Sequence, residues 1–222
     1  MNMSTSKPAD WLVPGLLLIL CVVPAAAGVA RLVMLGEGGP LTPDNARFFA
    51  APWPVALHIV SAIFYSVIGA FQFAPALRRR RPGWHRASGR MLVPTGLVAA
   101  LSGIWMTLFY PHVEGDSVQV YWVRLLVGWG MVAALLLGFA AIRRREISRH
   151  RAWMMRAYAL GMGAGTQVVL GGPLLIAFGS TSEFVRTLYM AGGWGLNLAI
   201  AEWLIHRGAA ARPLAVDNRG VI

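Results

Sequence analysis

The sequence contains little charge and almost no cysteine. Asp, Glu, Lys and Arg make up 13% of the 222 residues, about half of the share found in soluble domains. This shortage argues against a soluble globular domain. The single cysteine, Cys21, excludes an intrachain disulfide and a metal cluster held by cysteines. Hydrophobic side chains are abundant instead, at 57% of the residues, which is typical of a polytopic membrane protein.

Several motifs of well-known enzyme classes are also missing. The sequence has no Walker A motif, no GxGxxG, no HExxH and no GxSxG. Nucleotide-driven transport, Rossmann redox chemistry, zinc proteolysis and serine hydrolysis therefore lack their usual sequence support. No CxxCH run is present either, which excludes a covalent c-type haem.

Six segments are long and apolar enough to cross a bilayer as helices. They are residues 11–35, 53–75, 88–110, 120–142, 152–178 and 184–205. Loops rich in Pro, Gly and charge separate them, at 36–45, 78–83, 111–117, 143–148 and 179–183. We therefore predict an all-α fold, a polytopic membrane helix bundle of about six transmembrane helices, in which residues 1–222 form a single transmembrane domain.

The basic residues are distributed unevenly among the loops. Most of the 20 Lys and Arg residues lie at 78–90, at 143–151 or near the termini, whereas the opposite loops carry acidic residues. By the positive-inside rule, both termini are predicted to be cytoplasmic. These loops account for the net charge of +11 without a nucleic-acid partner. Segment 11–35 is predicted to be retained as a helix. The alternative is cleavage as a signal sequence, which would leave five spans.

Two of the Arg-rich loops resemble one another. RRRRPGWHRASGRM (78–91) and RRREISRHRAWMMR (143–156) both run from an Arg cluster to His-Arg-Ala and then into a span. An internal duplication would explain the match, and so would the general Arg content of cytoplasmic loops. In either case, His85 and His150 lie at similar depth at the start of alternate spans.

His85 and His150 are candidate metal ligands. Imidazole binds haem iron axially, so two histidines at equal depth can hold one haem b between them. The basic side chains close enough to pair with its propionates are Arg86, Arg90 and Arg151. The alternative is that both histidines are interfacial residues in basic loops.

Polar residues inside the spans form a second candidate site. In the second span, His58 begins a polar helical face that continues with Ser61, Tyr65, Gly69 and Gln72. Their spacing places them on one side of the helix, which should face the bundle interior.

Three charged residues fall inside predicted spans, where each costs about 2.5–3.5 kcal/mol on insertion scales. Arg156 and Glu202 are placed to form an ion pair between the fifth and sixth spans. Arg124 lies near the outer interface, within reach of His58. With Gln72, the residues His58, Arg156 and Glu202 make up a candidate interior site. The alternative is that these groups only join helices.

The fifth predicted span is rich in glycine. Gly161 and Gly165 predict a close contact with another helix. The Gly-Gly-Pro run at 171–173 predicts a kink or a break. A broken membrane helix can line a binding site.

Four stretches carry a resemblance to a known family. They are HIVSAIFYSVIGAFQFAP (58–75), RRRRPGWHRASGRM (78–91), IRRREISRHRAWMMRAYAL (142–160) and NLAIAEWLIHR (197–207). With them, the chain from His58 to Glu202 resembles the bacterial membrane family named domain of unknown function 2306. The resemblance implies a multi-pass protein of the bacterial inner membrane, and it implies no established activity.

Two shorter stretches resemble proteins that handle haem. GWHRASGR (83–90) is similar to a stretch on a haem-bearing helix of ferric reductases. In ascorbate-reducible b-type cytochromes, histidine pairs on helices two and four and on helices three and five hold two haems. His85 and His150 match the second pair, whereas His58 has no histidine partner in the fourth span. The resemblance therefore implies at most one bis-His haem. IRRREISRHRAWM (142–154) also resembles small membrane proteins that help to assemble haem–copper oxidases.

Three functional hypotheses follow. The first is a haem b-binding electron-transfer protein, which as an enzyme would be a membrane oxidoreductase. The second is an accessory or assembly subunit of a respiratory or redox membrane complex. The third is a small-solute transporter that uses the interior polar site. Membrane lipids are partners in all three.

Overall fold

The computed structural model describes residues 9–112, 117–178 and 182–210. Every secondary-structure element in these ranges is a helix, which confirms the predicted all-α fold. The elements are α1 (Ala9–Glu37), α2 (Ala46–Ala50), α3 (Pro52–Ala70), the 3-10 helix η1 (Phe71–Phe73), α4 (Pro75–Arg80), α5 (Pro82–Phe109), α6 (Val118–Arg143), α7 (Ile147–Gly161), α8 (Gly163–Phe178) and α9 (Glu183–Ala210).

Within the described ranges, four helices are long and apolar enough to cross a membrane: α1, α3 with η1, α5 and α6. α7 and α8 are bent by 43° relative to one another, and together they qualify as a fifth span. α9 is as long as α5, but Arg186, Asn197 and Glu202 interrupt its apolar sequence, and it does not qualify. A polytopic membrane bundle is therefore confirmed. The sixth span and the cytoplasmic position of both termini stay predictions.

The segment 78–83, predicted as a loop, is mostly helical. α4 ends at Arg80 and α5 begins at Pro82. Pro82 explains the start of α5, because the fixed φ of proline suits the first helical position and its missing N–H needs no partner there. Pro75 opens α4 in the same way. α5 therefore begins six residues before the predicted span at 88–110.

The break in the fifth predicted span lies earlier than the Gly-Gly-Pro run. α7 ends at Gly161 and α8 begins at Gly163, so the bend falls at Met162. Residues 171–173 lie inside a continuous α8, so the helix does not break there. Glycine has a low helix propensity, and Gly161 and Gly163 flank the bend on both sides.

The predicted glycine contact face is confirmed. A Cβ on residue 161 would lie 2.8 Å from Tyr65 Cε1, so Gly161 lets α7 approach α3. Gly165 lies against the backbone of Leu20, where a side chain would collide with α1. Small residues of this kind allow membrane helices to pack closely. The bent pair is thereby held between α1 and α3.

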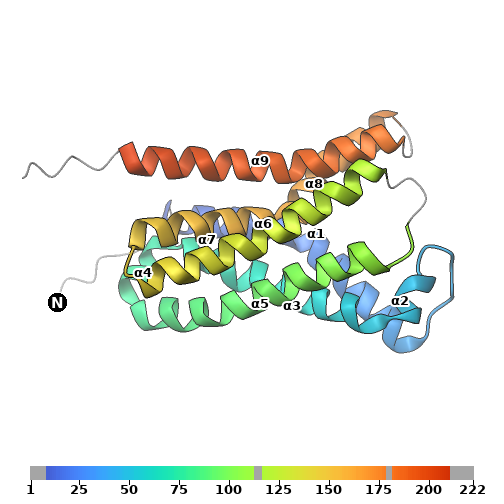
Figure 1. The fold of residues 1–222 in the computed structure, drawn as a ribbon, viewed down its shortest axis with the longest axis horizontal. Helices are drawn as coiled ribbons and strands as arrows, with labels where there is room; N and C mark the ends of the chain where they lie inside the picture. The colour runs from blue at the N-terminus through green and yellow to red at the C-terminus, as the bar shows by residue number, and fades with distance from the viewer. Residues whose placement is uncertain (1–8, 113–116, 179–181, 211–222) are drawn as a thin grey trace, which may run out of the picture.

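The helices gather the arginines of distant loops at one end of the bundle. α4, the starts of α5 and α7, and the ends of α6 and α9 lie together there (Figure 1). We call it the Arg-rich end, because it carries Arg78, Arg79, Arg80, Arg81, Arg86, Arg143, Arg144, Arg145, Arg149, Arg151 and Arg207. α2 and the starts of α6 and α9 lie at the opposite end (Figure 1). The two Arg-rich loops are thus on the same side, as their sequence pattern predicts.

Candidate functional site

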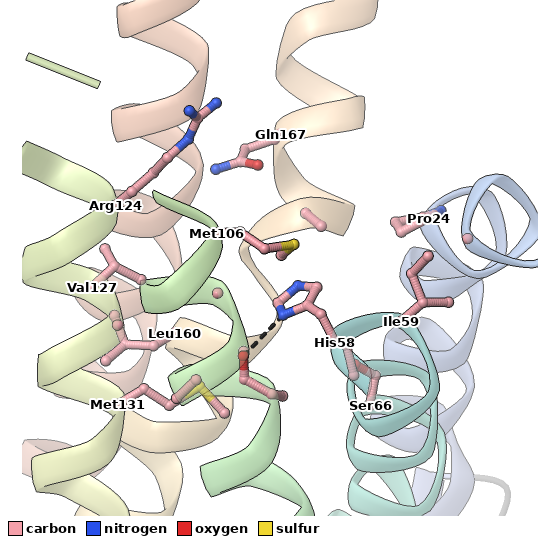
Figure 2. Close-up of a pocket in the computed structure, with 18 of the residues that line it drawn as sticks. Pro24, His58, Ile59, Ser66, Met106, Arg124, Val127, Met131, Leu160 and Gln167 are labelled. Atoms are coloured by element: carbon pink, nitrogen blue, oxygen red, sulfur yellow. Dashed lines mark hydrogen bonds between the residues drawn. The ribbon is translucent and has the colours of Figure 1, made fainter. Parts of the chain in front are cut away.

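A partly open cavity of about 460 Å³ lies in the bundle, lined by residues of α1, α3, α5, α6 and α8 among others. Its volume falls within the range of small-molecule sites, about 300–1,000 Å³. Figure 2 shows His58, Arg124 and Gln167 around the same space, each from a different helix. The lining surface is mostly apolar, and it includes Ile59, Met106, Val127, Met131 and Leu160.

The cavity lies beside the bend between α7 and α8. Met162 at the bend lines it, as do Gly161 before the bend and Gly165 after it. Discontinuous membrane helices are a recurrent feature of transporter binding sites. The expectation that a broken helix lines a site is therefore met, at a different position from the one predicted.

His58 projects from α3, and α5 holds its ring. Its Nδ1 lies 2.9 Å from the carbonyl of Ala99 and 3.3 Å from Ser102 Oγ. Because a carbonyl can only accept, Nδ1 donates the proton, and Nε2 of the neutral ring is an acceptor. Gly103 makes room for the ring, since a Cβ there would lie 3.3 Å from His58 Cε1. α5 thus fixes both the orientation and the tautomer of His58.

Arg124 and Gln167 both contact Met190 of α9. Arg124 Nη2 lies 3.8 Å from Met190 Sδ, and Gln167 Nε2 donates to the Met190 carbonyl at 3.0 Å. The sequence predicts that Arg124 approaches His58, and both side chains line the same cavity (Figure 2). Arg47 also lines this cavity, whose described lining contains no Asp or Glu. The cavity therefore places two guanidinium groups, those of Arg47 and Arg124, at a mostly apolar wall.

The four residues of the predicted interior site do not come together. His58 lines the cavity. Gln72 Nε2 donates to Ser88 Oγ at 2.7 Å and so joins η1 to α5. Arg156 and Glu202 form the predicted ion pair between α7 and α9, with Nε–Oε1 at 2.5 Å and Nη2–Oε2 at 2.8 Å. Contacts between helices therefore account for Gln72, Arg156 and Glu202.

His85 and His150 lie near the starts of α5 and α7, at the Arg-rich end. Each is the fourth residue of its helix, and they are close enough for their charges to interact when both are protonated. His150 Nδ1 donates to the Gly138 carbonyl at 2.8 Å, which leaves Nε2 for a metal, as in many metal-binding histidines. His85 Nδ1 is buried and has no hydrogen-bond partner in the described part of the chain. These donors fit a bis-His ligand set.

The arginines assigned to haem propionates fit that set less well. Arg86 and Arg90 are exposed on α5, and Arg86 is close enough to His85 to act on its charge. Arg151 directly follows His150, and its guanidinium lies beside Gly208 of α9. Neither the large cavity nor the smaller one described below is lined by His85 or His150. Among the described residues, no group of three or more His, Cys, Asp or Glu is placed to hold a metal ion.

Several cavity residues were not assigned to a site from the sequence. Gln167 is a lone amide in an apolar stretch, the same signal that marked Gln72, and it could have been found. Met106, Met131 and Met190 carry no such signal, because methionine in an apolar helix looks like ordinary core.

No curated protein and no solved structure matches the chain. One family model, described as a predicted membrane protein (DUF2306), matches residues 55–205. The match covers α5 to α8 and most of α3 and α9. It agrees with the resemblance carried by the stretches between His58 and Glu202, and it covers more than half of the chain. The chain therefore belongs to the DUF2306 family of predicted membrane proteins.

Proposed function

We propose that the protein binds a small amphipathic organic anion in its large cavity and carries it across the membrane. The observation that carries the proposal is the cavity of about 460 Å³, with the side chains of Arg124, His58 and Gln167 in a mostly apolar wall. The bend beside the cavity supports transport, because the two arms of a broken span can move relative to one another.

Two polar side chains, those of Arg124 and Gln167, lie close together in a mostly apolar lining. Arg124 and Gln167 lie together at one end of the site shown in Figure 2, and Met131 and Leu160 lie at the other. A guanidinium binds a carboxylate through charge-assisted hydrogen bonds. The apolar end buries hydrocarbon, at about 25 cal/mol per Å². This arrangement suits a carboxylate with a hydrocarbon chain. His58 adds a group that accepts a hydrogen bond when neutral and donates one when protonated.

The binding test compares three ligands of equal chain length: decanoate, decanol and decylammonium. We expect the detergent-purified protein to bind decanoate roughly ten- to a hundredfold more tightly than decanol, because a hydrogen bond to a charged group contributes about 1.5–3 kcal/mol. Decylammonium should bind most weakly. Trp194 lines the cavity, so quenching of tryptophan fluorescence can report binding. Equal affinities for the three ligands would indicate only hydrophobic binding of the decyl chain and would contradict the proposal.

Transport needs a separate measurement, because protonated decanoate crosses bilayers without the help of a protein. Decanesulfonate stays charged, so its entry into vesicles reports the protein. Proteoliposomes should accumulate it faster than vesicles without protein. Binding without entry would mean that the protein is a receptor for the anion and that the transport part of the proposal is wrong.

A second candidate function rests on the histidine pair. A buried ring nitrogen without a partner is unusual, and His85 Nδ1 is such an atom close to His150. A bis-His haem b held by these residues would supply one-electron transfer. It ranks second because no described cavity includes the pair. The assembly-subunit hypothesis and the bacterial inner-membrane location stay predictions.

The haem candidate predicts a b-type spectrum in the dithionite-reduced minus oxidised difference. We expect His85→Ala and His150→Ala each to abolish this spectrum, because one remaining imidazole cannot provide two axial ligands. His206→Ala is the control, since the side chain of His206 is exposed at the same end of the bundle. A wild-type protein that stays colourless when haem is supplied during expression would exclude the haem candidate.

A further inference from the structure

A second, smaller cavity lies at the Arg-rich end, between the start of α7 and the end of α9. Its volume is about 230 Å³. Arg149 and Arg151 of α7 provide charge at this cavity, and Ala152, Met155 and Ile205 provide apolar surface. The cavity is therefore amphipathic.

The arginines in and near this cavity differ in the interactions of their guanidinium groups. Arg149 forms an ion pair with Glu146, with Nη1–Oε2 at 2.9 Å. Arg207 stacks on the ring of Trp203, with its Cζ 4.5 Å from the centroid. Within the described ranges, Arg151 makes no ion pair. A net positive charge therefore remains where Arg151 lies.

Gly208 keeps space open in front of Arg151. A Cβ at residue 208 would lie 3.7 Å from Arg151 Nη1 and 3.8 Å from Nη2. A small side chain would only touch the guanidinium, whereas a large one would occupy the cavity that both residues line. Position 208 therefore offers a way to fill the cavity without changing its charge.

We propose that this cavity binds the headgroup phosphate of an anionic phospholipid. Arg151 would donate to the phosphate oxygens, since a guanidinium matches their geometry. The acyl chains would lie along α9, where Ile200, Trp203 and Leu204 expose 49%, 55% and 43% of their surface. A lipid uses both the charged and the apolar parts of the cavity, whereas a free phosphate would use only the charged part. Basic pockets between membrane helices are known sites for anionic headgroups.

The test is native mass spectrometry of the full chain in detergent, with equal amounts of phosphatidylglycerol and phosphatidylcholine added. We expect the wild type to retain phosphatidylglycerol preferentially. Arg151→Gln should reduce that retention roughly fivefold, the contribution of one basic residue near an anionic surface. Arg144→Gln is the matched control, because Arg144 is an exposed arginine just after α6 at the same end.

Two further measurements decide the identity of the ligand and of the site. Gly208→Leu should lower retention as Arg151→Gln does, because it fills the cavity while the net charge stays the same. Glycerol 1-phosphate added in excess should not displace the lipid. The proposal is overturned if Arg144→Gln has an equal effect, which indicates general surface charge, or if glycerol 1-phosphate competes fully, which indicates a site for soluble phosphates.

Discussion

Replacing Arg124 with glutamine is expected to weaken decanoate binding roughly ten- to a hundredfold, with decanol binding unchanged. Glutamine keeps a polar side chain at the cavity but removes the positive charge. The loss should be selective, because a charge-assisted hydrogen bond contributes about 1.5–3 kcal/mol and the alcohol has no charge to lose. The measurement is the same fluorescence titration, carried out with both ligands on both proteins.

Two further variants make this result specific. Arg124→Lys keeps the charge but loses the planar pair of donors, so its affinity for decanoate should lie between those of the wild type and Arg124→Gln. Arg207→Gln removes the same charge at the Arg-rich end, where α9 ends, and should leave both titrations unchanged. A decanoate affinity that Arg124→Gln does not alter would remove the anion-binding role from this residue. An equal loss of affinity for decanol would indicate that the substitution collapses the cavity.

The largest effect on stability is expected from Glu202→Gln. The substitution leaves Arg156 on α7 without its bidentate partner. Breaking a buried ion pair costs about 3–5 kcal/mol, and we expect roughly 1–3 kcal/mol here, because the Arg156 and Glu202 side chains are 26% and 37% exposed. The pair also offsets two charges between α7 and α9, which lets α9 lie beside the membrane-spanning helices despite its carboxylate. Thermal unfolding in detergent provides the measurement.

A double-mutant cycle separates this pairing from a general loss of polarity. Arg156→Gln with Glu202→Gln should be less destabilised than the sum of the two single variants, because neither charge is then left alone. Glu146→Gln removes a carboxylate from the exposed pair with Arg149 and should change stability by less than about 0.5 kcal/mol. Equal small effects at Glu202 and Glu146, or strict additivity in the cycle, would contradict the assigned role of the pair.

Local features of the sequence were sufficient for the elements and for parts of their packing. The polar face of α3 is one example. Ser61 and Tyr65 expose only 6% and 4% of their surface, as the helical spacing predicts. The ion pair of Arg156 and Glu202 is another, since an unpaired charge in a span is too costly to leave alone. The location of His85 and His150 near the starts of two helices at the Arg-rich end is a third.

The cavity could not be derived in the same way. Its walls come from α1, α3, α5, α6 and α8, and its polar side chains, among them His58, Arg124 and Gln167, are far apart in the sequence. The bend at Met162 depends on contacts such as that of Gly165 with Leu20 of α1, more than 140 residues earlier. The Gly-Gly-Pro run at 171–173 was the stronger local signal and still did not place the bend.

The sequence by itself determined the class of the protein, the approximate positions of its long apolar helices and the end of the bundle that carries the arginines. Each depends on about 20 consecutive residues, because an apolar stretch of that length is stable as a helix in a bilayer without other help. Only the tertiary structure decided that His58 shares a cavity with Arg124 while Gln72 and the ion pair lie elsewhere. That outcome depends on which helices cross and how closely, and the closeness is determined by small residues such as Gly165 meeting side chains or backbone from distant parts of the chain.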